Sequence, residues 1–187
     1  MNYLILVNKK NGLNEKYIPD NLVEVKLKTG GNKKIYLEKK TYKQIKKLLY
    51  DMNKLFDSEI VIDSGYRPYL YQENLMKDLL KEKGEDAYKS LALPGFSEHQ
   101  TGLAVDIGFY KDNLYDDKFN IDDYKKEFKW LQNNAYKYGF IIRYPKDKEA
   151  ITGYIYEPWH LRYIGEYAQF LTKYNLTLEE YYEMFVI

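Results

Sequence analysis

Apolar residues alternate with small or polar ones from Leu103 to Phe109, and this two-residue period predicts a half-buried β-strand. Leu103 and every second residue after it would face the core of the domain. Asp106 would point to the opposite face, with a small residue two positions away on either side. These small neighbours leave room for a metal ion or a substrate beside the carboxylate.

Further segments of the chain repeat apolar residues at the spacing typical of strands or of helices. Strands are predicted at 3–7, 22–27, 59–63, 140–144 and 154–164. Helices are predicted at 41–55, 68–83, 122–138, 165–174 and 177–185, with capping boxes at Thr41 and Thr177. Polar residues 110–123 predict a surface loop. A charged turn joins the last two strands, so we expect a hairpin in a mostly antiparallel sheet.

The length and composition narrow the class of protein. A chain of 187 residues suits one domain with a sizeable core. A net charge of +1 gives no reason to expect a nucleic-acid partner or an anionic membrane, and the absence of cysteine excludes a disulfide framework. The apolar run at residues 3–7 is too short for a signal peptide, and no segment is long enough to span a membrane. We therefore expect a soluble, cytoplasmic protein; the sequence specifies no oligomeric state.

The chain contains only two histidines, His99 and His160, and each lies near carboxylates in a segment of small residues, glycine or proline. Catalytic zinc sites use three protein ligands, such as imidazole nitrogen and carboxylate oxygen, together with water. His99, Asp106 and His160 would supply such a set, because a turn at Gly102 would bring His99 back to the strand. Glu157, three residues before His160, is the candidate base for the attacking water.

In a regular strand Glu157 and His160 would point to opposite faces. Pro158 lies between them and cannot donate a ladder hydrogen bond, so we expect a bulge or strand end that turns both side chains toward one cavity. Isolated residues of these types are usually structural. Four suitable groups in two compact motifs favour a functional site instead.

Three separated segments then become recognisable: Ser-Gly-Tyr-Arg-Pro at 64–68, Ser-Glu-His-Gln-Thr-Gly-Leu-Ala-Val-Asp at 97–106 and Glu-Pro-Trp-His at 157–160. They resemble the signature segments of VanY-type zinc D,D-carboxypeptidases, which group with VanX dipeptidases and some phage endolysins. The bifunctional VanXY enzymes of vancomycin resistance are the most similar subgroup. The resemblance covers about residues 40–183. It implies an α+β fold: a single zinc D,D-peptidase domain over 1–187, core motifs at 61–165, and an antiparallel sheet that carries the zinc site among packed helices.

The resemblance also implies roles for four more residues. Arg67 would polarise the scissile carbonyl and stabilise the oxyanion. Gln72, Ser97 and Tyr144 would recognise the terminal residue of the substrate. On residue type alone, Arg67 would form a surface ion pair, Gln72 would be exposed on a helix, and Ser97 would bond to local backbone.

The implied function is zinc-dependent hydrolysis of D-Ala-D-Ala, or removal of the C-terminal D-Ala from peptidoglycan precursors, in vancomycin resistance. Glu157 would take a proton from water and pass it to the leaving amine. One alternative is an L,D-carboxypeptidase or a stem-peptide endopeptidase of the same group. Another is an inactive, zinc-stabilised binding domain, which the presence of Glu157 and Arg67 disfavours because a structural zinc site needs neither.

Overall fold

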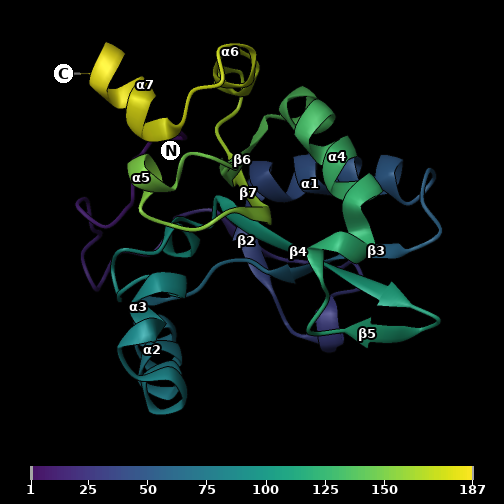
Figure 1. Ribbon diagram of the computed structural model, residues 1–187, viewed down its shortest axis with the longest axis horizontal. Coiled ribbons are helices and arrows are strands. Elements are labelled where there is room, and N and C mark those ends of the chain that lie inside the picture. The colour runs from purple at the N-terminus through teal and green to yellow at the C-terminus, as the bar shows by residue number, and fades with distance from the viewer. Residues whose placement is uncertain (1, 187) are drawn as a thin grey trace.

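The computed structural model describes residues 2–186, and the side chains of residues 89 and 90 lie outside this description. Its main sheet has five antiparallel strands, ordered β3-β4-β7-β6, with β5 paired to β4 (Figure 1). The strands are β3 (Glu59–Ser64), β4 (Ala104–Lys111), β5 (Leu114–Asp116), β6 (Phe140–Tyr144) and β7 (Glu157–Tyr163). A small second sheet pairs β1 (Leu22–Glu24) with β2 (Tyr36–Glu38). The α+β prediction with an antiparallel sheet is confirmed.

Helices pack around the sheet and against its ends (Figure 1). They are α1 (Lys39–Met52), α2 (Tyr69–Lys83), α3 (Ala87–Ser90), α4 (Lys125–Asn134), α5 (Glu149–Thr152), α6 (Tyr167–Lys173) and α7 (Leu178–Phe185). Short 3-10 helices are η1 (Gly30–Asn32), η2 (Gly84–Asp86), η3 (Glu98–Thr101), η4 (Ile121–Tyr124) and η5 (Ala135–Tyr138). In Figure 1, α2 and α3 form a lobe apart from α1 and α4.

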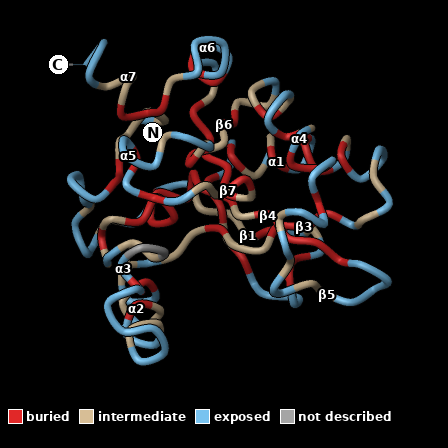
Figure 2. Tube along the Cα trace, viewed as in Figure 1, coloured by how far each residue is buried: buried red, intermediate tan, exposed pale blue. Residues whose placement is uncertain are grey.

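The main core lies between the sheet and helices α1 and α4. The predicted inward residues of β4 are all buried in it, together with Leu48 of α1 and Leu131 of α4. Figure 2 shows this buried interior as the red segments at the centre of the molecule. Asp106 belongs to the other face of the same strand, so the alternation of residues 103–109 has separated the core from the site as predicted.

Helix α1 begins two residues earlier than its sequence predicted. The expected capping box at Thr41 is wrong, because the buried Glu38 caps this helix and accepts a hydrogen bond of 2.9 Å from the backbone N–H of Thr41. The helix ends at Met52, so Leu55 lies outside it and is 61% exposed. The capping box at Thr177 is confirmed, with reciprocal bonds to Glu180.

Three connecting segments also differ from expectation. Residues 3–7 form no strand, since the backbone carbonyls of Tyr3 and Ile5 accept hydrogen bonds from the buried Arg162 and not from a neighbouring strand. The predicted loop at 110–123 contains β5, which extends β4 into a hairpin. The predicted turn at 145–153 contains α5. Residues 3–7 thus bond to a partner distant in sequence, whereas the other two segments form a local hairpin and a short local helix.

Candidate active site

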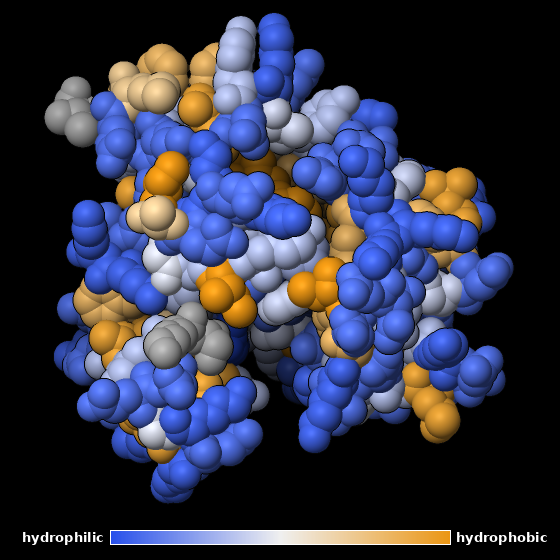
Figure 3. All heavy atoms as spheres, viewed as in Figure 1, coloured by the Kyte–Doolittle hydropathy of each residue, from blue (hydrophilic) through white to orange (hydrophobic). Residues whose placement is uncertain are grey.

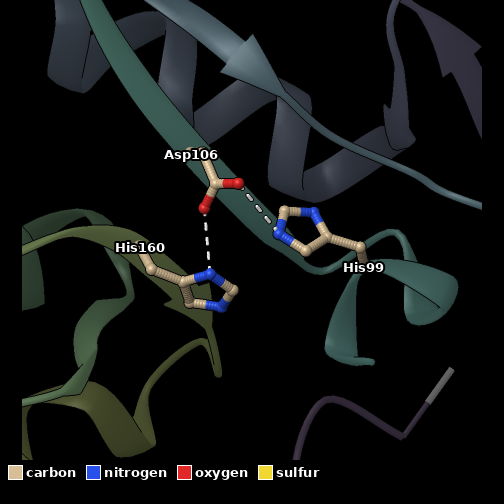
Figure 4. Close-up of side chains that lie close together, drawn as sticks. All are labelled: His99, Asp106 and His160. Carbon is tan, nitrogen blue, oxygen red and sulfur yellow. Dashed lines mark ion pairs between the residues drawn. The ribbon is translucent and has the colours of Figure 1, made fainter. Parts of the chain in front are cut away.

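Two strands bring together the two residues at the centre of the predicted metal group. Asp106 on β4 and His160 on β7 are direct partners across the antiparallel ladder. Opposed residues of such a pair have side chains on the same face of the sheet. His99 enters from η3, so that all three side chains point toward one another (Figure 4).

Backbone geometry before β4 positions His99. Gly102 has a positive φ of 69°, a conformation that favours glycine, and ends η3 just before the strand. The ring Nδ1 of His99 lies 2.7 Å from the backbone carbonyl oxygen of Gly65, which accepts its proton. This bond leaves the lone pair of Nε2 directed at the site.

The potential metal-ligand atoms of the three side chains lie close together, but two of them lack a hydrogen-bond partner among the described residues. Nε2 of His99 lies 3.1 Å from Oδ2 of Asp106, and Nδ1 of His160 lies 2.9 Å from Oδ1 of the same carboxylate. Nε2 of His99 and Oδ1 of Asp106 are nevertheless buried without an aligned hydrogen bond to any residue within the described range. The ligand atoms lie within 4.8 Å of one another. Two imidazoles and one carboxylate in this arrangement suit a zinc ion.

A bulge in β7 places Glu157 beside this group. The register of β6 and β7 shifts between Ile142 and Tyr144. Ile142 pairs with Leu161 but Tyr144 pairs with Glu157, so a step of two residues along β6 corresponds to a step of four along β7. The predicted irregularity at Pro158 is therefore confirmed. Oε2 of Glu157 lies 3.9 Å from Nδ1 of His160, and the glutamate side chain is 13% exposed. Both side chains consequently face one site, with Glu157 nearer to solvent.

The charges of the group depend on one another. Burial opposes ionisation of Asp106, but His99 and His160 outweigh it and hold the pKa of this carboxyl well below its ordinary value. Burial, reinforced by Arg67 and opposed by Asp106, lowers the pKa of His99 to about 4. Burial also disfavours the charged form of His160, but Asp106, Glu98 and Glu157 outweigh it and raise its pKa to about 9. His99 is thus neutral at pH 7, the form in which imidazole binds metals.

Glu157 has the electrostatics of a proton acceptor that works near neutral pH. Burial, reinforced by Asp106 and opposed by His160 and Arg67, raises its pKa to about 7. A general base is most effective when its pKa lies near the working pH. The predicted assignment of Glu157 as base is consistent with this environment.

Arg67 lies next to the metal group, and one of its N–H donors has no hydrogen-bond partner among the described residues. Its Nη2 is 4.0 Å from Oδ2 of Asp106, and its Nε is buried without a hydrogen-bond partner among the described residues. The backbone N–H of Arg67 donates to the carbonyl oxygen of His99, which fixes the two segments together. Burial lowers the pKa of this guanidinium, although Asp106 opposes the shift. A surface ion pair, the alternative on residue type, does not describe this arginine, whose side chain is only 16% exposed.

The three predicted substrate-binding residues lie in different surroundings. Tyr144 is buried, and its ring centroid is 4.9 Å from that of His160. Gln72 is buried in α2, not exposed, and donates a 2.7 Å hydrogen bond to the carbonyl oxygen of Ala92. Ser97 is the N-cap residue of η3 and is also buried. Tyr144 therefore contacts the metal group, whereas Gln72 bonds to the loop that leads to His99.

A cavity of about 320 Å³ adjoins this loop and is lined by Lys9, Tyr88, Leu91, Leu93, Phe96 and Tyr154. Tyr154 also packs on Tyr144, with ring centroids 4.7 Å apart, which connects the cavity to the metal group. Figure 3 shows that this face of the molecule is hollowed between the lobe of α2 and α3 and the part that carries β5. A larger cavity, of about 620 Å³, lies between α1 and β3 and contains none of the predicted site residues.

Sequence reasoning missed a network of buried charges behind His160. Glu98, Arg143 and Arg162 have fully buried side chains, and Glu179 on α7 completes the set. One oxygen of Glu98 accepts from Nε of Arg143 at 2.7 Å and from Nη1 of Arg162 at 2.5 Å. These arginines hold the pKa of Glu98 well below its ordinary value against the effect of burial. The available signal was an arginine between apolar or aromatic neighbours in each of two strands, Arg143 in β6 and Arg162 in β7.

The comparisons with known proteins agree with this geometry. The family described as VanY, D-alanyl-D-alanine carboxypeptidase, matches residues 34–166, which is more than half of the chain. The chain belongs to the VanY family. Membership confirms the predicted class, a peptidase, and the predicted family.

Two curated proteins illustrate the relationship. VanXYC of Enterococcus gallinarum, a bifunctional D-Ala-D-Ala dipeptidase and D-Ala-D-Ala carboxypeptidase, is 39% identical over 98% of this chain and 95% of that protein. YodJ of Bacillus subtilis, whose carboxypeptidase assignment is provisional, is 44% identical over 97% of this chain and 67% of its own length.

Two solved structures share the fold. The LdcB LD-carboxypeptidase is 42% identical, with a TM-score of 0.85 over 97% of this chain and 86% of that chain. A mutant VanY D,D-pentapeptidase from a VanB-type resistance cassette, in complex with Zn(II), is 31% identical, with a TM-score of 0.79 over 97% of this chain and 99% of that chain. The predicted zinc cofactor is thus supported by a VanY-family structure and by a compatible His–Asp–His group here. None of the helices in residues 2–186 has the length and apolar character of a membrane span.

Proposed function

We propose that this VanY-family protein is a zinc-dependent carboxypeptidase that releases the C-terminal D-alanine of cell-wall peptides. The observation that carries the proposal is the convergence of His99, Asp106 and His160, with Glu157 beside them at 3.9 Å from His160. Metal ligands alone suit a structural site, whereas a neighbouring carboxylate with a raised pKa suits hydrolysis.

In this proposal zinc is held by Nε2 of His99, a carboxylate oxygen of Asp106 and Nδ1 of His160. When bound, zinc would polarise the attacking water and the scissile carbonyl. Glu157 takes the proton from the water and delivers it to the leaving amine. Arg67, whose Nε has no hydrogen-bond partner among the described residues, donates from its guanidinium to the oxygen that becomes negatively charged during the attack.

Substrate recognition is assigned to the side of the site that carries Tyr144. Tyr144 stands at the His160 ring, and Gln72 and Ser97 shape the approach through the loop that precedes η3. The cavity lined by Phe96 and Tyr154 has room for the part of the peptide that precedes the terminal D-alanine.

The residue before the terminal D-alanine distinguishes two candidate activities. The family description and VanXYC favour a D,D-peptidase that acts on D-Ala-D-Ala or on precursors ending in it. The LdcB structure, at 42% identity and a TM-score of 0.85, favours an L,D-carboxypeptidase that shortens a tetrapeptide. A role in vancomycin resistance requires the first activity, because it depends on removing D-Ala-D-Ala termini.

Release of D-alanine from D-Ala-D-Ala, a wall pentapeptide and a wall tetrapeptide tests the proposal. Release from the dipeptide or pentapeptide, abolished by a chelator and restored by zinc, would establish the D,D activity. Release from the tetrapeptide alone would establish the L,D activity. Zinc-loaded protein that releases D-alanine from none of the three would contradict the proposed function and favour the binding-domain alternative.

Glu157→Gln provides the control for mechanism. This isosteric change removes the base but leaves the three proposed zinc ligands in place. Loss of turnover by a factor of about 10² to 10⁴, with zinc still bound, is expected. Turnover by the zinc-loaded variant close to that of the wild type would exclude Glu157 as the base.

A further inference from the structure

The second ring nitrogen of His160 faces a single carboxylate, that of Glu98. While Nδ1 of His160 is directed at Asp106 and Glu157, Nε2 lies 3.6 Å from Oε2 of Glu98. Neither Nε2 nor Oε2 has a hydrogen-bond partner among the described residues, and both are buried. The separation exceeds a hydrogen bond, so a small approach of the two groups would satisfy both atoms.

The carboxylate of Glu98 is held on its other side. Oε1 accepts hydrogen bonds from Nε of Arg143 at 2.7 Å and from Nη1 of Arg162 at 2.5 Å. Both guanidiniums are themselves fixed: Arg143 forms a two-bond pair with Glu179, and Arg162 donates to the backbone carbonyl oxygens of Tyr3 and Ile5. With one oxygen fully engaged, the carboxylate cannot rotate away, and its second oxygen stays directed at His160.

We propose that Glu98 is a positioning residue for the metal centre: it accepts the Nε2–H of His160 and so presents Nδ1 of that ring to the metal. An outer carboxylate of this kind fixes the orientation and tautomer of a ligating histidine. Gly65 does the same for His99 through its backbone carbonyl oxygen. The inference rests on the metal site of the proposed function and assigns Glu98 a role in metal binding.

Glutamine cannot replace Glu98 in this position. If its amide oxygen faces the two arginines, its NH₂ group meets the Nε2–H of His160, donor against donor. If the oxygen faces His160, the NH₂ group meets the arginines. Either orientation loses one set of contacts, so Glu98→Gln is a sharp test with almost no change in volume.

Glu179→Gln is the matched control. It removes one buried negative charge from the same arginine, Arg143, but in the described part of the chain Glu179 makes no hydrogen bond or ion pair with the metal group. A purely structural network would make the two substitutions equivalent. The positioning role makes them differ in zinc binding.

The experiment measures zinc affinity of the full chain by competition with a chromophoric chelator. We expect Glu98→Gln to weaken zinc binding by about 10-fold to 100-fold. Glu179→Gln should change it by less than about 3-fold while lowering the melting temperature. Equal zinc affinities for the two variants, or a wild-type affinity for folded Glu98→Gln, would overturn the proposal.

A spectroscopic measurement on the wild type decides the question even if Glu98→Gln does not fold. Because the chain has only two histidines, the imidazole nitrogen signals of zinc-loaded, ¹⁵N-labelled protein come from two rings. We expect a slowly exchanging proton on Nε2 of His160. A fast-exchanging or absent proton there would overturn the role of Glu98. Wild-type protein that binds no zinc would instead refute the metal site itself, and lack of D-alanine release by zinc-loaded protein would refute only the peptidase activity.

Discussion

At the scale of single residues, the site combines groups whose charges are set by burial. The sequence predicted His99, Asp106, His160 and Glu157 because the chain has two histidines and both stand in compact acidic motifs. The structure brings the four together. The sequence assigned no separate role to Glu98, since its significance depends on two arginines that lie far away in sequence.

The raised pKa of Glu157 has a consequence for stability in the zinc-free protein. Burial raises this pKa from 4.5 to about 7, so the folded state binds the proton more tightly than the unfolded state. The folded state therefore loses stability as the pH rises from 4.5 to about 7, and the loss is complete above that range. Glu157→Gln removes the buried charge.

We accordingly expect zinc-free Glu157→Gln to have a larger free energy of unfolding than zinc-free wild type at about pH 8, by on the order of 2 kcal/mol. The difference should shrink toward about pH 4. Denaturant unfolding at both pH values, in the presence of a chelator, measures it. A variant that is less stable than the wild type at the higher pH would show that Glu157 is not destabilised by burial.

At the scale of elements, strands and helices with a regular apolar period could be predicted from the sequence. Which of two possible hydrogen-bond partners a backbone group uses could not. The strand at β4 and the hairpin of β6 and β7 followed from alternation and from the turn between them. The start of α1 was misplaced because Glu38, just before the predicted box, reaches the same backbone N–H group of Thr41. The helix therefore begins at Lys39, with Glu38 as its N-cap residue.

The connection between β3 and α2, which contains Gly65, gives a prediction at this scale. A Cβ atom added to Gly65 would lie 2.5 Å from the carbonyl oxygen of Tyr36 and 2.7 Å from Cγ2 of Ile35. Because the nearest of these atoms belongs to the backbone of β2, the segment around Gly65 must move, and with it the carbonyl oxygen that accepts from His99. Gly65→Ala should lower the free energy of unfolding by on the order of 2 kcal/mol and weaken zinc binding.

Gly84→Ala is the control for that substitution. Unlike Gly65, Gly84 has a positive φ, 57°, but a Cβ atom there would meet nothing within 4 Å. We expect a smaller loss of stability, of about 1 kcal/mol, from backbone strain alone, and unchanged zinc affinity. Unchanged zinc binding and stability in Gly65→Ala, measured by the same titration and unfolding curves, would contradict the proposed support of His99.

At the scale of the whole molecule, two hydrophobic clusters are joined through buried charges. The smaller cluster includes Leu171 of α6 and Leu178 of α7, and Glu179 beside it reaches Arg143 in β6. Arg162 continues the network to the N-terminal segment through Tyr3 and Ile5. The predicted strand at 3–7 is wrong for this reason: two of its backbone carbonyl oxygens accept hydrogen bonds from a side chain more than 150 residues away, and not from a neighbouring strand.

The contribution of α7 to the whole fold can be measured with two substitutions. Leu178 is fully buried, and Leu178→Ala should lower the free energy of unfolding by about 2–4 kcal/mol. Met184 lies on the same helix and is 62% exposed, so Met184→Ala should change it by less than about 0.5 kcal/mol. Chemical denaturation compares them, and equal effects would mean that α7 does not dock as described.

The central claim is that one zinc ion is held by His99, Asp106 and His160, with Glu157 beside the ion but not required to hold it. Metal content of purified protein, after loading and removal of free zinc, tests this most directly. We predict one zinc ion per chain for the wild type and for Glu157→Gln, and strongly reduced zinc for His99→Ala, Asp106→Ala and His160→Ala. Full zinc content in any folded variant of the three ligands would contradict the assignment.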